Sequence, residues 1–198
     1  LLRRHINEYY QQNIKNIDCS IISMNCVGGV SHELGLRFNS PTINLWFKPS
    51  EFIKFLSQLE HYLYDCEIQV DAERSAECGY PVGRLDDINV YFTHYESFEQ
   101  AKGKWEERLK RLNMDNLYIV MVERDGCSKQ DILSFDNLKY KHKVIFTAKE
   151  YPQFHSAYYI PESEENACNV KNLCLYKSRF TGKRWLDEFD WVSFLNER

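Results

Sequence analysis

The stretch Cys19-Ser20-Ile21-Ile22-Ser23-Met24 runs directly into Asn25-Cys26-Val27-Gly28-Gly29, and this passage decides the fold. Its first six residues carry no charge, which is typical of a strand that is buried on both faces of a sheet. The glycine pair then ends the run at a turn. We therefore predict a central strand over residues 19–24 with a loop at its carboxyl end.

Strands and helices alternate in the rest of the chain. Residues 87–93, 117–122 and 143–147 are rich in β-branched and aromatic side chains and predict further strands. Apolar stripes at helical spacing predict helices over residues 1–16, 50–65, 97–112 and 128–135. Parallel strands need crossover connections, which usually contain a helix. We therefore expect an α/β fold of three layers, with a mainly parallel sheet and helices on both faces.

Two segments have weaker patterns. Residues 67–70 predict a short strand, and residues 71–84, with Gly79, Pro81 and Gly83, predict a loop or a small hairpin. After residue 150 the pattern fades until a last aromatic helix. A chain of 198 residues is long enough for one domain. We expect its core at about residues 17–150 and residues 151–198 packed on it as an appendage.

Composition excludes several classes of protein. The net charge of -4 and pI of about 5.9 leave no basic excess that would attract nucleic acid. No apolar run approaches the roughly 20 residues of a membrane span, and no secretory signal is visible. The seven cysteines are odd in number and lack C-x-x-C spacing. They predict free thiols in a reducing, cytoplasmic compartment, and no metal ligand is assigned.

The loop after the first strand is the first candidate site, because ligands of open α/β sheets bind beyond the carboxyl ends of the strands. Gly28 and Gly29 would permit positive φ and present backbone amides to an anion, and Asn25 could add a donor. Cys26 in this electropositive setting would have a lowered pKa and act as a nucleophile. The alternatives are a small buried cysteine and a tight turn without a ligand.

Two further candidates follow in the chain. His94, at the end of the strand over residues 87–93, is placed to act as a general base, or else makes a structural hydrogen bond. Lys104, Arg108 and Arg111 share one helix face that could hold a diphosphate or a carboxylate. The alternative for these three is a solvated face paired with acids such as Glu107.

Arg124 and Asp125 directly follow the strand over residues 117–122. Their donors and acceptors suit sugar hydroxyls, although a plain type I turn has the same sequence. The chain contains neither GxxxxGK[ST] nor GxGxxG, so no nucleotide cofactor is identified.

Several segments together resemble a known family. They are Ile22-Ser23-Met24-Asn25-Cys26-Val27-Gly28-Gly29, Ser40-Pro41-Thr42-Ile43, Phe52-Ile53-Lys54-Phe55-Leu56, Tyr80-Pro81-Val82-Gly83, His94-Tyr95, Lys104-Trp105 with Arg108 and Arg111, and Lys143-Val144-Ile145-Phe146. The chain resembles a bacterial family of unknown function whose members are often labelled exopolysaccharide-biosynthesis proteins. The resemblance implies surface-polysaccharide assembly and assigns no catalytic residue. Met24 stands where a second Asn is expected, which weakens any scheme with paired amides.

Two functions stay open. The first is a transferase that moves an acyl or glycosyl group from an activated donor, a nucleotide sugar or an acyl-CoA, to a saccharide acceptor. The Cys26 loop and the Lys104, Arg108 and Arg111 face would hold the donor, with His94 as the base. Acyl transfer is preferred because the parts of an oxyanion site are present and a metal-binding D-x-D is absent. The second is a scaffold protein that binds an anionic carbohydrate without catalysis. The oligomeric state stays open.

Overall fold

The computed structural model describes residues 2–197 and contains a central sheet of four parallel strands in the order β1-β5-β6-β7. The strands are β1 (Ser20–Ser23), β5 (Leu117–Val122), β6 (His142–Thr147) and β7 (Ala157–Tyr159). All four residues of β1 are buried, as their uncharged sequence predicts. The first three strands were predicted, and β5 has the predicted bounds. β7 was not predicted.

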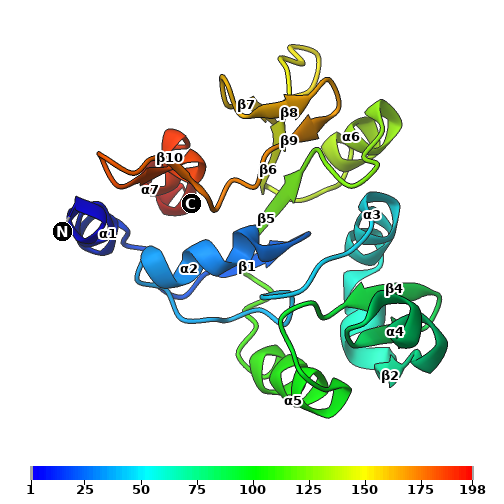
Figure 1. Cartoon of the computed structure of the whole chain (residues 1–198). Helices are drawn as coiled ribbons and strands as arrows, with labels where there is room; N and C mark the ends of the chain where they lie inside the picture. The colour runs from blue at the N-terminus through cyan, green and yellow to red at the C-terminus, as the bar shows by residue number, and fades with distance from the viewer. Residues whose placement is uncertain (1, 198) are drawn as a thin grey trace.

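The order of strands in this sheet follows their order in the chain. Crossovers between parallel strands are almost always right-handed, so crossovers that step in one direction place their helices on one face. In Figure 1, α3 (Pro49–Ser57) and α6 (Lys129–Asp136) lie together on one side of the sheet. The terminal helices α1 (Leu2–Asn13) and α7 (Trp191–Asn196) lie on the other side. The two ends of the chain therefore cover the second face.

A second sheet departs from the prediction of mainly parallel strands. It contains β2 (Gln69–Val70), β3 (Val82–Leu85) and β4 (Ile88–Tyr91), and both of its pairings are antiparallel. The prediction that residues 87–93 join the parallel sheet was therefore wrong. Only two residues join β3 to β4, which suffices for a hairpin but not for a crossover. The α/β class and the parallel central sheet are confirmed.

Residues 71–84 contain a helix that was not predicted, α4 (Ala72–Cys78). The side chain of Asp71 caps its first turn by accepting from the N–H of Arg74, and Gly79 ends it with a φ of 75°. None of its residues is buried. Because an exposed helix needs no apolar stripe, hydrophobic periodicity could not reveal it.

The remaining elements are short, apart from α5. Ser97 caps α5 (Phe98–Leu109) as predicted, by accepting from the N–H of Gln100. The others are η1 (Cys26–Gly29), α2 (Val30–Glu33), η2 (His61–Asp65), η3 (Trp185–Glu188) and the hairpins β8 (Glu164–Asn166) with β9 (Asn169–Val170) and β10 (Tyr176–Ser178) with β11 (Lys183–Arg184). Across residues 2–197, no helix has both the length and the apolar character that crossing a membrane requires.

A short extended segment joins the two larger sheets. Trp46 and Tyr91 exchange two backbone hydrogen bonds of 2.9 Å, and the N–H of Phe47 donates to the carbonyl of Met24, also at 2.9 Å. The rings of Trp46 and Tyr91 stack with centroids 4.1 Å apart. Residues 46–47 therefore hold β4 beside the carboxyl end of β1.

The C-terminal segment forms part of the core. The ring of Phe146 on β6 lies 6.1 Å from that of Trp191, and Tyr118 on β5 lies 5.3 Å from Phe194. Trp191 is fully buried. These aromatic contacts cover the face of the sheet on which the crossover helices do not pack.

We expect Trp191→Ala to lower the free energy of unfolding by about 3–5 kcal/mol, because it leaves a large cavity against the central sheet. Chemical denaturation monitored by circular dichroism would measure the change. Phe180→Ala is the control, since Phe180 is 90% exposed and should shift stability by less than about 0.5 kcal/mol. Equal effects of the two substitutions would contradict a structural role for the C-terminal segment.

Candidate functional site

The end of β1 turns directly into η1, and Asn25 makes this turn. Its side-chain oxygen accepts from the N–H of Val27 at 3.1 Å, and its carbonyl accepts from the N–H of Gly28 at 3.2 Å. Among residues 2–197, the Nδ2 group of Asn25 has no hydrogen-bond partner. Asn25 therefore caps the helix with its oxygen and leaves its amide nitrogen for a ligand.

Cys26 and His94 lie in contact. The sulfur of Cys26 is 2.8 Å from Nε2 of His94, although the two residues are 68 positions apart in the chain. Cys26 is partly exposed and His94 is exposed, so a ligand can reach both groups. His94 follows the antiparallel strand β4, and it arrives here because residues 46–47 tie that strand to β1. We predicted that Cys26 and His94 would meet because both follow strands of one parallel sheet. Instead, they follow strands of two different sheets.

The electrostatic setting of Cys26 differs from the prediction. Burial raises the pKa of the Cys26 thiol, and its own backbone N–H opposes this effect only in part. The expected lowering of this pKa was therefore wrong, because loss of hydration outweighs the few N–H groups of a single helical turn. Because this raised pKa keeps the proton on the Cys26 sulfur, a base such as the neighbouring His94 must remove it before the sulfur can act as a nucleophile.

The two glycines have roles other than those predicted. Neither has a positive φ, and Gly29 lies in the helical region at -63°. A Cβ on Gly28 would lie 2.1 Å from Oγ of Ser23, so Gly28 permits close packing of η1 on β1. Its N–H is already donated to Asn25. The N–H that opens η1 belongs to Cys26, and a helix provides no internal acceptor for its first donors.

A pocket of about 280 Å³ lies at this end of the sheet. It is lined by residues 25–27 after β1, by Val122, Arg124 and Asp125 after β5, and by Trp46 and residues 171–174. Because β1 and β5 are parallel neighbours, their ends meet at one edge. The structure thus brings the Cys26 loop together with Arg124 and Asp125, as predicted for adjacent strand ends.

Arg124 is partly committed to protein contacts. Its Nη1 donates to the carbonyl of Val170 at 2.8 Å, and its Nε lies 3.6 Å from Asp125. Asp125 has a φ of 58°, in the left-handed region that favours glycine or short polar residues in turns. The Asp125 carboxylate, 41% exposed, therefore remains the more accessible polar group on this wall.

The basic face of α5 does not reach the pocket. Lys104 and Arg111 both pair with Glu107, at 2.7 and 2.9 Å, which is the alternative weighed for this face. Arg108 is buried and donates to the carbonyl of Ile43 at 2.7 Å and to the hydroxyl of Tyr95 at 2.8 Å. The structure therefore does not place the three side chains around one anion. Arg108 instead holds Ile43, which precedes Trp46 of the pocket wall, and Tyr95, which follows His94.

One cysteine of the pocket was not selected from the sequence. The sulfur of Cys174 lies 3.8 Å from the carbonyl of Cys26, and burial raises its pKa to about 11. Nothing in its sequence context distinguishes it from the other five unselected cysteines, since a long-range loop contact brings it here.

A larger hollow of about 1000 Å³ lies at the opposite, amino-terminal ends of the strands. It is lined by Asn16, residues 56–61, 114–118 and 139–142, and Glu197. No motif predicted it, because its lining combines polar and apolar residues from segments far apart in the chain.

The comparisons identify the family. A family described as "Domain of unknown function (DUF1919)" matches residues 1–196, so the chain belongs to this family. A Haemophilus influenzae protein described as an uncharacterized protein is 41% identical over 195 residues, which cover 98% of this chain and 92% of that one. These findings agree with the resemblance to a bacterial family of unknown function. The link to exopolysaccharide biosynthesis stays a prediction.

We expect Gly28→Ala to destabilise the protein by about 1–3 kcal/mol, because its new Cβ would overlap Oγ of Ser23. Gly29→Ala is the matched control, since the nearest atom would be 3.8 Å away. Thermal unfolding of the two variants measures the difference. Equal melting temperatures would show that the end of β1 is not packed as described.

The raised pKa of the Cys26 thiol also predicts how its reactivity depends on pH. The sulfur stays protonated at neutral pH, so alkylation by iodoacetamide should be slow at about pH 7 and rise steadily as the solution becomes more alkaline. Peptide mass mapping would follow Cys26, with the exposed Cys168 as the reference thiol. A fast rate that is constant from about pH 6 to 8 would instead indicate a resting thiolate.

Proposed function

We propose that this protein is a thiol-dependent acyl transferase of bacterial surface-polysaccharide assembly, with Cys26 as the nucleophile and His94 as its base. One observation carries the proposal: the sulfur of Cys26, a residue that lines a pocket, lies 2.8 Å from Nε2 of His94. A nucleophile within hydrogen-bond reach of a base is the geometry that covalent acyl transfer requires. The polysaccharide context rests on the sequence resemblance alone.

The first half of the proposed reaction forms an acyl-enzyme. The Cys26 sulfur attacks the carbonyl carbon of a thioester or ester donor, and its proton passes to Nε2 of His94. The tetrahedral intermediate collapses, the bond to the leaving group breaks, and the leaving group takes the proton from His94. In the second half, an acceptor hydroxyl gives its proton to His94 and attacks the thioester carbon, and the Cys26 sulfur leaves and takes that proton back from His94.

The proposed mechanism assigns two donors to the oxyanion of the intermediate. They are the backbone N–H of Cys26 and Nδ2 of Asn25, which replace the glycine amides favoured from the sequence. Removing one such donor typically slows acyl transfer by about 10²–10³-fold. The single Asn25 suffices for this arrangement, so it needs no second amide at Met24.

The size of the pocket favours an acyl group over a whole nucleotide sugar. Its volume of about 280 Å³ lies just below the roughly 300–1,000 Å³ of small-molecule sites. A short acyl chain or one sugar ring fits this space. Trp46 offers an aromatic surface for a sugar ring, and Asp125 offers acceptors for its hydroxyls.

A scaffold protein that binds an anionic carbohydrate is the second candidate. It is favoured by one observation: within residues 2–197, the only side-chain hydrogen bond of His94 is the one to Cys26. Catalytic imidazoles are usually oriented by a third group, as in the Ser-His-Asp arrangement. In this alternative, the thiol and the imidazole contact a ligand without making a bond.

The two candidates differ in whether Cys26 becomes acylated. Incubation with acetyl-CoA or p-nitrophenyl acetate should add one acetyl group to Cys26, detected by intact-mass and peptide mass spectrometry. Cys26→Ala should abolish this product, and His94→Ala should slow its formation by about 10²–10⁴-fold. Cys168→Ala is the control. Acetylation that persists in Cys26→Ala, or that His94→Ala leaves unchanged, would contradict the enzyme.

A further inference from the structure

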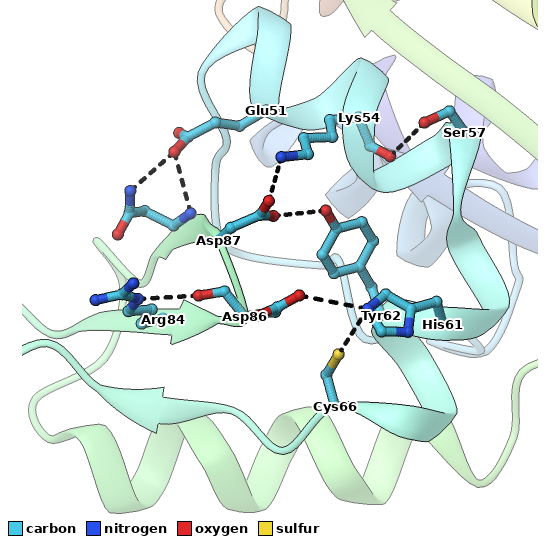
Figure 2. A network of polar contacts seen from close by, with 10 residues as sticks. Glu51, Lys54, Ser57, His61, Tyr62, Cys66, Arg84, Asp86 and Asp87 are labelled. Atoms are coloured by element: carbon cyan, nitrogen blue, oxygen red, sulfur yellow. Dashed lines mark hydrogen bonds and ion pairs between the residues drawn. The ribbon is translucent and has the colours of Figure 1, made fainter.

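A second group of cysteine and histidine side chains lies at the end of α3, apart from the Cys26 pocket. His61 begins the π-helical turn η2, Cys66 directly follows it, and Asp86 lies on the turn between β3 and β4. Nε2 of His61 is 3.3 Å from the sulfur of Cys66 and 3.4 Å from Oδ2 of Asp86. Figure 2 shows the three side chains pointing toward one another from separate segments.

The spacing of these atoms matches a metal centre. One nitrogen, one sulfur and one oxygen all lie within 4.8 Å of one another. A tetrahedral zinc ion with bonds of about 2.0–2.3 Å holds neighbouring ligand atoms about 3.3–3.6 Å apart. The two measured separations from Nε2 fall in or next to this range. Only small side-chain movements are needed for all three atoms to bind one ion.

The orientation of His61 supports the same conclusion. Oδ2 of Asp65 lies 3.5 Å from Nδ1 of His61, on the side of the ring away from Cys66. A carboxylate at one ring nitrogen keeps the proton there, so that the other nitrogen can bind a metal. The π-helical turn carries both His61 and Asp65, and such turns often occur at functional sites.

The charges around the group also favour a cation. Asp87 already has protein partners, because it pairs with Lys54 and accepts from the hydroxyl of Tyr62 at 2.7 Å (Figure 2). Asp86 differs: among residues 2–197, its carboxylate pairs with His61 alone. Because Oδ2 of Asp86 lies 3.4 Å from Nε2 of His61, a cation bound at this nitrogen would also be in reach of the carboxylate, which would offset its charge.

The thiol experiences the same negative field. Burial raises the pKa of Cys66 first, and the carboxylates of Asp86, Asp65 and Asp87 raise it further. A divalent cation reverses this effect, because it binds the thiolate and displaces the thiol proton to solvent.

We propose that His61 Nε2, Cys66 Sγ and Asp86 Oδ2 form a binding site for a divalent transition-metal ion, with Zn²⁺ as the best fit. The mixed nitrogen, sulfur and oxygen set suits this borderline-soft ion better than Mg²⁺ or Ca²⁺, which prefer oxygen. The fourth coordination position of the ion would face solvent, because the side chains of His61 and Asp86 are 42% and 58% exposed. The spacing between cysteines could not predict this group, because it joins residues 61 and 66 to a turn 20 positions later.

The test is Zn²⁺ titration by isothermal calorimetry of the full chain carrying Cys26→Ala, so that the other thiol–imidazole pair cannot bind metal. We expect one Zn²⁺ per chain, and binding about 10-fold weaker or more in His61→Ala, Cys66→Ser and Asp86→Asn. Asp87→Asn is the matched control and should bind Zn²⁺ with nearly unchanged affinity. Asn tolerates the left-handed backbone of Asp86, where φ is 53°, so this variant should fold.

Co²⁺ provides a second measurement that depends on the sulfur ligand. The Co²⁺-loaded protein should show a near-ultraviolet thiolate-to-cobalt charge-transfer band, which Cys66→Ser should abolish while its circular dichroism spectrum stays unchanged. Absence of stoichiometric Zn²⁺ binding would overturn the proposal. So would equal affinities in Cys66→Ser and Asp87→Asn, or a Co²⁺ band that persists without Cys66.

Discussion

The structure depends on the backbone hydrogen bonds of residues 46–47. These residues bind the carbonyl of Met24 at the end of β1 on one side and Tyr91 of β4 on the other, with bonds of 2.9 Å. A buried backbone donor left without a partner costs about 1–3 kcal/mol, so the segment has one strongly preferred position. The fully buried Phe47 anchors the segment in the core. Through this link, a thiol from the parallel sheet and an imidazole from the antiparallel sheet come into contact.

This link also explains which parts of the structure could be predicted. β1, β5 and α5 were predictable because uncharged runs and a serine cap are local signals. The placement of β4 in a separate sheet was not, because strand pairing depends on partners that are distant in sequence. The exposed α4 was missed because it carries no apolar stripe, and β7 because its three residues give almost no periodicity.

The candidate site shows the same division. Cys26, His94 and Asn25 were selected because each follows a predicted strand, and the structure brings Cys26 and His94 into contact although the strands before them belong to different sheets. The roles of Gly28 and Arg108 could not be predicted, since they depend on packing against Ser23 and on the carbonyl of Ile43. The sequence does not distinguish a glycine that faces a ligand from a glycine that permits close packing.

The chain uses two cysteine–histidine contacts in different surroundings. The pKa of Cys26 is governed by burial and its own backbone, whereas that of Cys66 is raised by three nearby carboxylates as well. A thiol beside an imidazole with no carboxylate partner among residues 2–197 suits proton transfer and nucleophilic attack. A thiol and an imidazole that face a carboxylate suit a cation. The neighbouring charges therefore separate a proposed reactive centre from a proposed metal centre.

The proposed chemistry of the pocket depends on the contact between Cys26 and His94, which NMR of protein with ¹⁵N-labelled histidine can examine. Carbamidomethylation of Cys26 changes the group that faces Nε2 of His94. We expect this modification to shift the imidazole nitrogen signals assigned to His94 and to leave those of His61 and His142 in place. Unchanged His94 signals in the fully modified, folded protein would contradict this contact.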